Sequence, residues 1–438
     1  MSSKEKLFEK FPPVSREEWM EKILSDLKGE DFNKKLVWKT NEGFELKPFY
    51  LREDIQKLPA IDSLPGQEPF LRGSSSKNNN WLIRQNIEVS DYKEANRKAL
   101  DILMKGVSSL GFVLKNPDSI NPSNIEHLLK GIHFESVEIN FLSEGKAREL
   151  LEICYKLIEQ SSSDLDKIHG AIEADPLSRL MLNGKLCVSL GAGLDYLADL
   201  MKESSVLKNL RTVQVNASNF TNAGADVVTE LAFALSMGNE YLSVLTERDI
   251  PPDTAASKIR FSFGTGSNYF FEIAKLRAAR ILWSIITGGY NTVAGINRRM
   301  EIHAVTCEWN KTLRNPYVNL LRTQTEAMSA ALGGADSITI DPFDKVTGIT
   351  TDFSERIARN QQLLMKEEAY FDRVADPAGG SYYIEMLTSI ISENAWKLFL
   401  EIGNAGGFTE ALKTGFIHGR LKAISEKQVK GETGIKSE

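Results

Sequence analysis

The sequence predicts a (β/α)8 TIM barrel preceded by a helix and an extended arm. Two observations support this class. From about residue 90 onward, short β-branched stretches alternate with helical patterns, as expected for parallel strands joined by crossover helices. Eight strands can be counted, whereas a doubly wound sheet usually has about five to seven. The count favours a closed barrel, although periodicity alone does not decide between the two architectures.

The expected elements follow one another along the chain. Strands are expected at 107–114, 136–142, 167–174, 212–218, 259–264, 301–307 and 337–343, with a final strand around 371–377. Helices are expected at about 144–160, 192–204, 223–246, 267–287, 315–333 and 352–368, and a last helical stretch at 385–402 and on to about 425. We therefore divide the chain into an arm (1–89), the barrel (90–390) and C-terminal helices with the start of a linker (391–438).

The first 80 residues have the character of an arm. Ser15 and Glu18 form a capping box ahead of a helix with one apolar face. Residues 36–49 alternate around Gly43 and predict a short hairpin. Residues 51–80 show little periodicity. Because such a segment buries too little surface to be stable alone, we expect it to wrap another protein. Partial disorder, or packing on its own barrel, is the alternative.

Composition limits the classes of function. The 438 residues carry a net charge of -6, which argues against a broad nucleic-acid surface. No window approaches 18 consecutive apolar residues, and the N-terminus lacks the apolar core of a secretory signal. Three widely spaced cysteines exclude a disulfide framework and suit a reducing compartment. We expect a cytoplasmic protein that binds neither nucleic acid nor membrane.

Local chemical motifs are weak. GTGSNY (264–269) has two glycines of a phosphate-binding turn, but a simple tight turn is the plainer interpretation. The Gly-rich turn DPAGGSYY (376–383) allows a close backbone approach to a ligand. His169 and His303 fall inside expected strands, where hydrogen-bonded core histidines are commoner than catalytic ones. The histidine spacing matches no metal site.

Several long blocks carry a family resemblance. They are FPPVSREEW (11–19) with LKGEDFNKKLVWKTNEGF (27–44), FSFGTGSNYFFEIAKLRAARILW (261–283), NPYVNLLRTQTEAMSAALGGADS (315–337), TDFSERIARNQQLLMKEE (351–368) and DRVADPAGGSYYIEMLT (372–388). The chain resembles the cobalamin-dependent acyl-CoA mutases, and specifically the methylmalonyl-CoA mutase family. The resemblance implies a (β/α)8 barrel that threads acyl-CoA along its axis, an arm for subunit contacts and a separate C-terminal cobalamin domain. That domain's DxHxxG motif does not occur here, so we expect the domain to be absent from this chain.

The positions that carry chemistry in the family have changed. The resemblance implies a tyrosine against the coenzyme, where this sequence has Asn86, and a glutamine in each of two strands, where it has Glu173 and Val305. It also implies a tyrosine–histidine pair at the thioester, where this sequence has Ser218 with Asn219. Near the coenzyme's ribose the resemblance implies an acid, and this sequence has Lys345. The CoA-gripping stretch before Trp81 is SSSKNNN (74–80), with Asn79 in place of an arginine.

These changes indicate the small (beta) subunit type of a heterodimeric mutase, an isomerase of propionate metabolism. We expect no catalytic, cofactor-binding or metal-binding residues in this chain. We expect a homologous large subunit to bind adenosylcobalamin and to carry out catalysis. When this chain is expressed alone, we expect that it can form homodimers. One alternative is an active isobutyryl-CoA-type subunit whose cobalamin domain is a separate chain. The other is a barrel-derived binding or assembly protein outside mutase metabolism.

Overall fold

The computed structural model describes residues 14–434, which form parts of two compact units, Met1–Leu51 and Arg52–Glu438. The first unit contains helix α1 (Arg16–Asp26), helix α2 (Phe32–Leu36) and a two-stranded antiparallel hairpin of β1 (Trp38–Lys39) and β2 (Glu45–Leu46). The predicted capping box and hairpin are both confirmed: the Ser15 amide donates to Glu18 at 2.8 Å, and the Glu18 amide donates to the Ser15 hydroxyl.

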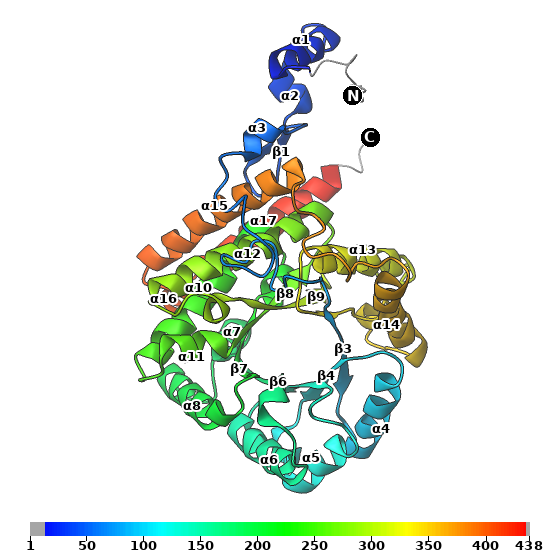
Figure 1. Ribbon diagram of the computed structural model, residues 1–438, viewed down its shortest axis with the longest axis vertical. Coiled ribbons are helices and arrows are strands. Elements are labelled where there is room, and N and C mark those ends of the chain that lie inside the picture. Colours follow the sequence, from blue (N-terminus) through cyan, green and yellow to red (C-terminus); the bar gives the residue numbers. More distant parts are fainter. Residues whose placement is uncertain (1–13, 435–438) are drawn as a thin grey trace, which may run out of the picture. The chain divides into compact units, whose positions relative to one another are not determined.

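The second unit is a closed parallel barrel, seen down its axis in Figure 1. Its strands close in the order β10-β3-β4-β5-β6-β7-β8-β9. Their bounds are β3 (Leu82–Glu88), β4 (Ser109–Leu114), β5 (Glu138–Ser143), β6 (Gly170–Ala174), β7 (Leu210–Asn216), β8 (Ile259–Thr265), β9 (Glu301–Thr306) and β10 (Ser337–Thr339). The predicted fold class and seven of the eight expected strands are confirmed.

The remaining expected strand was misplaced. The segment 371–377 forms turns and bends, and Tyr370 directly before it and Asp376 within it adopt positive φ angles of 55° and 46°, which lie outside the β region. The eighth strand is instead β3, which lies before residue 90, where the barrel was expected to begin. Its centre is the polar run Arg84, Gln85 and Asn86, which differs from the continuous apolar run that is typical of a buried parallel strand.

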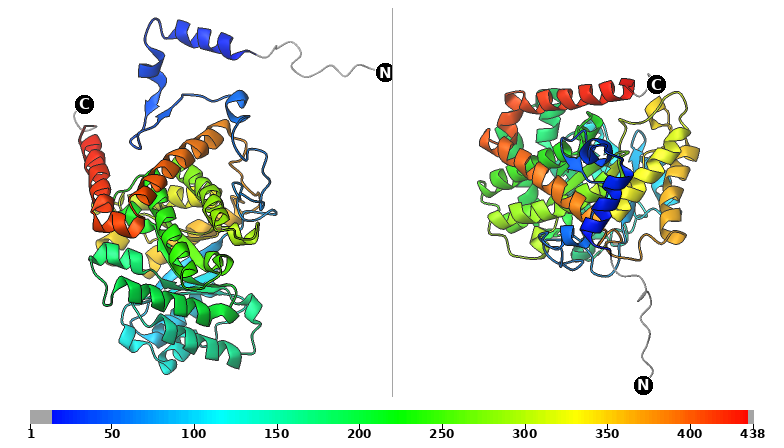
Figure 2. Two further views of the ribbon diagram at one scale, coloured as in Figure 1. Left: turned by 90° about the vertical axis from the view of Figure 1, so that its left-hand side faces the viewer. Right: turned by 90° about the horizontal axis from the view of Figure 1, so that it is seen from above.

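Helices surround the strands, as Figure 2 shows from the side. They are α3 (Arg52–Ile55), α4 (Tyr92–Leu103), α5 (Pro122–Leu129), α6 (Ala147–Gln160), α7 (Pro176–Asn183), α8 (Leu190–Glu203), α9 (Ser218–Asn222), α10 (Val227–Thr246), α11 (Pro252–Ser257), α12 (Tyr269–Gly289), α13 (Val318–Leu332), α14 (Asp352–Glu367), α15 (Tyr382–Asn404), α16 (Phe408–Lys413) and α17 (Phe416–Gly434), with short 3-10 turns between some of them. No helix among residues 14–434 is long and apolar enough to cross a membrane.

The core lies between the strands and the helices. Phe261 and Phe263 of β8 are fully buried, and the Phe261 ring meets Trp283 of α12 edge-on with centroids 4.8 Å apart. Alternate residues of the same strand, Arg260 and Ser262, are polar and equally buried. Since successive strand residues face opposite sides, the apolar side chains pack outward on the helices and the polar ones occupy the barrel interior.

A buried ionic clamp ties residues 61–72 to the rest of the second unit. The guanidinium of Arg72 contacts Asp376 at 2.8 Å and Glu385 at 3.1 Å, and also donates to the carbonyls of Ile61 and Ser63. Arg277 of α12 binds the same two carboxylates. This part of the expected arm therefore packs on its own barrel. The backbone of the Gly-rich turn comes close to this clamp, since a Cβ at Gly379 would lie 2.5 Å from Arg72 Nη1.

Candidate functional site

The interior of the barrel is crossed by a buried ion pair. Arg84 Nη2 of β3 lies 2.8 Å from Glu173 Oε1 of β6, and both side chains are at most 6% exposed. These strands are three positions apart in the barrel order, so the pair spans the interior. Arg84 Nε also donates to Asn86 Oδ1 at 3.1 Å. Two predicted positions, Asn86 and Glu173, are therefore joined through an arginine.

A second ion pair crosses the interior between β8 and β5. Arg260 Nη2 lies 3.0 Å from Glu138 Oε2, and Arg260 Nε donates to Glu301 at 2.6 Å. Although burial acts the other way, Arg211 and Arg260 hold the pKa of Glu301 well below its usual range. We call the Arg84–Glu173 and Arg260–Glu138 pairs the axial cross-links.

His303 belongs to this interior layer. Its ring nitrogens lie 2.8 Å from the Ser337 hydroxyl and 3.3 Å from the Thr339 hydroxyl. Burial, with Arg84 and Arg260 nearby, holds the pKa of His303 well below its usual range, so the ring is neutral at pH 7. The interpretation of His303 as a hydrogen-bonded core histidine is confirmed.

Three of the predicted positions lie at the C-terminal ends of β7 and β9. Ser218 and Asn219 begin α9, directly beyond β7, and Asn219 Nδ2 donates to the Ser178 hydroxyl at 2.7 Å. Val305 is the penultimate residue of β9, and its carbonyl accepts a hydrogen bond from Thr265 at 3.2 Å. Asn219 is thus engaged by the barrel itself, and Val305 offers no polar side chain for chemistry.

Lys345 lies in the loop after β10 and is held by two carboxylates. Its Nζ is 2.9 Å from Asp341 and 2.6 Å from Glu308. Partial burial disfavours the charged form, but these carboxylates raise the pKa of Lys345 above its ordinary value. The lysine is a fixed cation at the position where the resemblance implies an acid.

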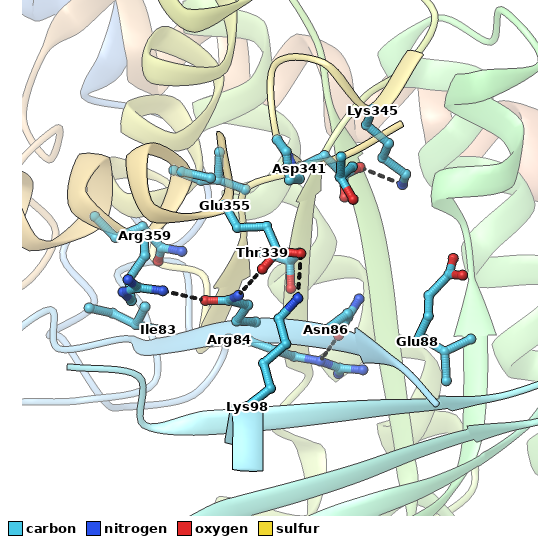
Figure 3. Close-up of a pocket in the computed structure, with 17 residues that line it drawn as sticks. Ile83, Arg84, Asn86, Glu88, Lys98, Thr339, Asp341, Lys345, Glu355 and Arg359 are labelled. Atoms are coloured by element: carbon cyan, nitrogen blue, oxygen red, sulfur yellow. Dashed lines mark hydrogen bonds and ion pairs between the residues drawn. The ribbon is translucent and has the colours of Figure 1, made fainter. Parts of the chain in front are cut away.

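A cavity of about 300 Å³ opens at this corner of the barrel (Figure 3). It brings together Asn86 and Lys345 of the predicted positions, with residues of β3, β10, α4 and α14. Glu173, Ser218, Asn219 and Val305 do not line it. Sequence reasoning missed its charged lining: Arg84, Lys98, Asp341, Glu355 and Arg359. The polar and charged residues within the strand segments 82–88 and 138–143 were the signal for a charged interior.

The GTGSNY turn has no need of a phosphate. The amides of Gly264 and Gly266 donate to Glu230 at 2.8 Å and Glu272 at 2.9 Å, and Lys275 neutralises both carboxylates. The simpler interpretation as a tight turn is therefore favoured. Among residues 14–434, no cluster of histidine, cysteine, aspartate and glutamate has the arrangement of a metal site.

The side chains at the C-terminal end of the barrel do not fit adenosylcobalamin. The resemblance implies a carboxylate for the coenzyme's ribose, and the side chain there is the ammonium of Lys345, whose own carboxylate partners are engaged. The axial cross-links occupy the path that the resemblance assigns to acyl-CoA.

The fold and the axial cross-links define a (β/α)8 barrel protein with a charged interior. The sequence profile described as methylmalonyl-CoA mutase matches residues 39–436. The chain is 49% identical over 435 residues to a methylmalonyl-CoA mutase small subunit of Porphyromonas gingivalis, covering 99% of this chain and 69% of that protein. It is 33% identical to the small subunit of Streptomyces virginiae, covering 94% and 67%.

It is also 30% identical to the human mitochondrial methylmalonyl-CoA mutase, with 94% of this chain and 58% of that protein covered. The chain therefore belongs to the methylmalonyl-CoA mutase family, and its sequence is of the small-subunit type. It spans about 69% of the small subunit from P. gingivalis and 57% of the mutase of Rhizobium meliloti.

Proposed function

We propose that this chain is the non-catalytic small subunit of a heterodimeric methylmalonyl-CoA mutase in the cytoplasm. The complex interconverts methylmalonyl-CoA and succinyl-CoA by radical rearrangement. Its homologous large subunit binds adenosylcobalamin and acyl-CoA and carries the chemistry. The names of the small-subunit relatives from P. gingivalis and S. virginiae support such a partnership.

The single observation that carries the non-catalytic role is the cross-linked interior. A thioester that reacts inside a barrel needs a continuous path along the axis, and two buried arginine–carboxylate pairs span that path here. Opening it requires breaking buried ion pairs, which costs about 3–5 kcal/mol for each partner left unpaired. Binding of the pantetheine arm would have to offset that cost before gaining any affinity.

Helix α1 supports the partner role. None of its residues is buried, although it carries an apolar face, and Trp19 is 50% exposed. Trp38 of the hairpin is equally exposed. Exposed aromatic side chains on a short unit of this kind are typical of surfaces covered in an assembly.

The test is to express the chain alone and together with the homologous large subunit. We expect the chain alone to show no turnover with adenosylcobalamin and methylmalonyl-CoA, and to bind neither more tightly than about 1 μM by calorimetry. Co-expression should give an active one-to-one complex. Turnover of isobutyryl-CoA by this chain with a separate cobalamin-binding protein would instead establish the active-subunit alternative. Failure to co-purify with any mutase subunit would leave a binding or assembly protein.

A further inference from the structure

The cavity at the corner of β3 and β10 is lined by four cationic side chains. Three of them have a carboxylate partner. Arg84 pairs with Glu173 at 2.8 Å, Lys98 with Glu355 at 2.7 Å and Lys345 with Asp341 at 2.9 Å.

Arg359 of α14 is the exception. No carboxylate among residues 14–434 lies within salt-bridge distance of its guanidinium, although the residue is only 6% exposed. Its Nη1 donates to Gln85 Oε1 at 2.9 Å, while its Nε is buried with no hydrogen-bond acceptor in the same part of the chain. The side-chain amide of Gln85 lies between Arg359 and Glu355, and its Nε2 donates to Glu355 Oε2 at 3.1 Å.

A buried guanidinium without a carboxylate partner favours the binding of an oxyanion. Arginine keeps its charge when buried, and a buried N–H without an acceptor is costly. A carboxylate or phosphate accepts two parallel hydrogen bonds from the planar fork. Lys98 can add a further donor, since its ammonium lines the same cavity and its side chain is 34% exposed.

We propose that this cavity binds a small oxyanion, a carboxylate or a phosphate, held by the guanidinium of Arg359 with Lys98 at the entrance. Three carboxylates line the cavity, and each has a lysine partner: Asp341 pairs with Lys345, Glu355 with Lys98, and Glu88 with Lys115 at 2.9 Å (Figure 3). The guanidinium of Arg359 is therefore left for the ligand. A second buried guanidinium atom without an acceptor, Arg84 Nη1, belongs to another lining residue. The proposal does not depend on the assignment as a mutase subunit.

The experiment is calorimetric titration of the full chain with inorganic phosphate and, separately, with acetate at constant ionic strength. We expect a millimolar or tighter dissociation constant for at least one anion. Arg359→Gln should weaken it at least about tenfold, because it removes the charge and the fork. The matched control is Arg356→Gln on the same helix, an exposed arginine whose guanidinium lies 5.5 Å above the Phe353 ring. This control should bind as the unmodified chain does.

Binding of phosphate only, or of acetate only, identifies which oxyanion the site prefers and supports the proposal if Arg359→Gln abolishes it. Absence of binding of both anions at about 50 mM overturns it, as does equal binding by Arg359→Gln. If the glutamine variant is unstable, Arg359→Lys provides the test. It keeps the charge but loses the fork, so it should bind at least about threefold more weakly, and unchanged affinity would reject the site.

Discussion

Arg84 Nη2 lies 2.8 Å from Glu173 Oε1, and this contact joins β3 to β6 across the barrel interior. Both side chains are almost fully buried, so water screens the pair very little. By the family resemblance the position of Glu173 holds a glutamine in active mutases. The exchange of one amide for a carboxylate gives Arg84 a buried ionic partner, and it links the first strand of the barrel to the fourth.

Glu173→Ala should destabilise the chain by about 3–5 kcal/mol, because it leaves the guanidinium of Arg84 buried without its carboxylate. The double variant Arg84→Met with Glu173→Leu should recover most of that loss, since two apolar side chains of similar volume carry no desolvation cost. Equilibrium urea unfolding of the two variants and the unmodified chain measures both effects. Equal stability of Glu173→Ala and the unmodified chain would show that the pair contributes little.

Gly379→Ala should destabilise by about 1–3 kcal/mol, as overpacking in a closed site does. The new Cβ would lie 2.5 Å from Arg72 Nη1 and closer still to Asp376 Oδ2, and Arg72 is held by four acceptors. Gly403→Ala in α15 is the matched control. Nothing lies within 4 Å of its new Cβ, so helix propensity should stabilise that variant by up to about 1 kcal/mol. Thermal or urea unfolding of both variants measures these changes in stability. A loss of stability in both variants would contradict the claim that the close contact at Gly379 is the cause.

The barrel was predictable because most of its strands are β-branched or aromatic runs followed by long helices. The missed helices α5 and α7 also had signals, since each begins with proline after an asparagine or aspartate cap. β3 was not predicted, because its buried residue Arg84 is balanced by Glu173, a carboxylate 89 residues further along the chain. The turn at 371–377 depends on positive φ angles at residues that sequence patterns do not mark.

The site was predictable in position but not in chemistry. Val305 lies near the C-terminal end of β9, and Asn219 and Lys345 follow the C-terminal ends of β7 and β10, as expected for a barrel whose chemistry occurs at that face. Their partners come from other elements. Asn219 is held by Ser178 of α7, and Lys345 is held by Glu308 from the loop after β9. Local sequence contains no information on such pairings, so the paired state of each group had to come from the fold.

The three thiols should differ sharply in reactivity. Burial raises the pKa of Cys154 and of Cys307 to about 12, so almost no thiolate forms at pH 8, whereas Cys187 is exposed. Titration of the native chain with an aromatic disulfide reagent at pH 8 should modify one thiol rapidly, and denaturation should expose the other two. Cys187→Ser should abolish the rapid phase. Rapid reaction of more than one thiol in the native chain would contradict the buried positions.

Glu326 should make stability depend on pH. Burial raises its pKa to about 7 despite the ammonium of Lys311, from an ordinary value of 4.5. Between these values the unfolded chain releases a proton that the folded chain keeps, so the free energy of unfolding falls as pH rises, by at most about 3 kcal/mol. The unmodified chain should therefore lose stability relative to Glu326→Gln from pH 4.5 to 7.

The control for that titration is Glu367→Gln, which replaces an exposed carboxylate at the end of α14. Its stability difference from the unmodified chain should stay flat over the same range. Urea unfolding at several pH values provides the comparison. A constant difference between the Glu326→Gln variant and the unmodified chain would mean that Glu326 titrates as an ordinary carboxylate.

The last prediction concerns the first unit of the chain. The sequence offers seven large apolar residues in this unit for contact with a partner: Phe8, Phe11, Trp19, Ile23, Leu27, Trp38 and Phe44. Phe8 and Phe11 lie outside the described residues, and Phe44 is buried within this chain, at 8% exposure. Trp19 and Trp38 are each 50% exposed, so we expect these two side chains to contact the partner subunit.

We expect the double variant Trp19→Ala with Trp38→Ala to weaken the complex with the large subunit at least about thirtyfold. Two aromatic residues at an interface typically contribute about 1–2 kcal/mol or more each. The matched control is Met104→Ala, because Met104 is 88% exposed at the end of α4 in the second unit. Analytical ultracentrifugation of co-purified subunits gives the dissociation constants. Deletion of residues 1–51 removes the whole unit and should prevent co-purification, and an intact complex after that deletion would place the partner on another surface of the barrel.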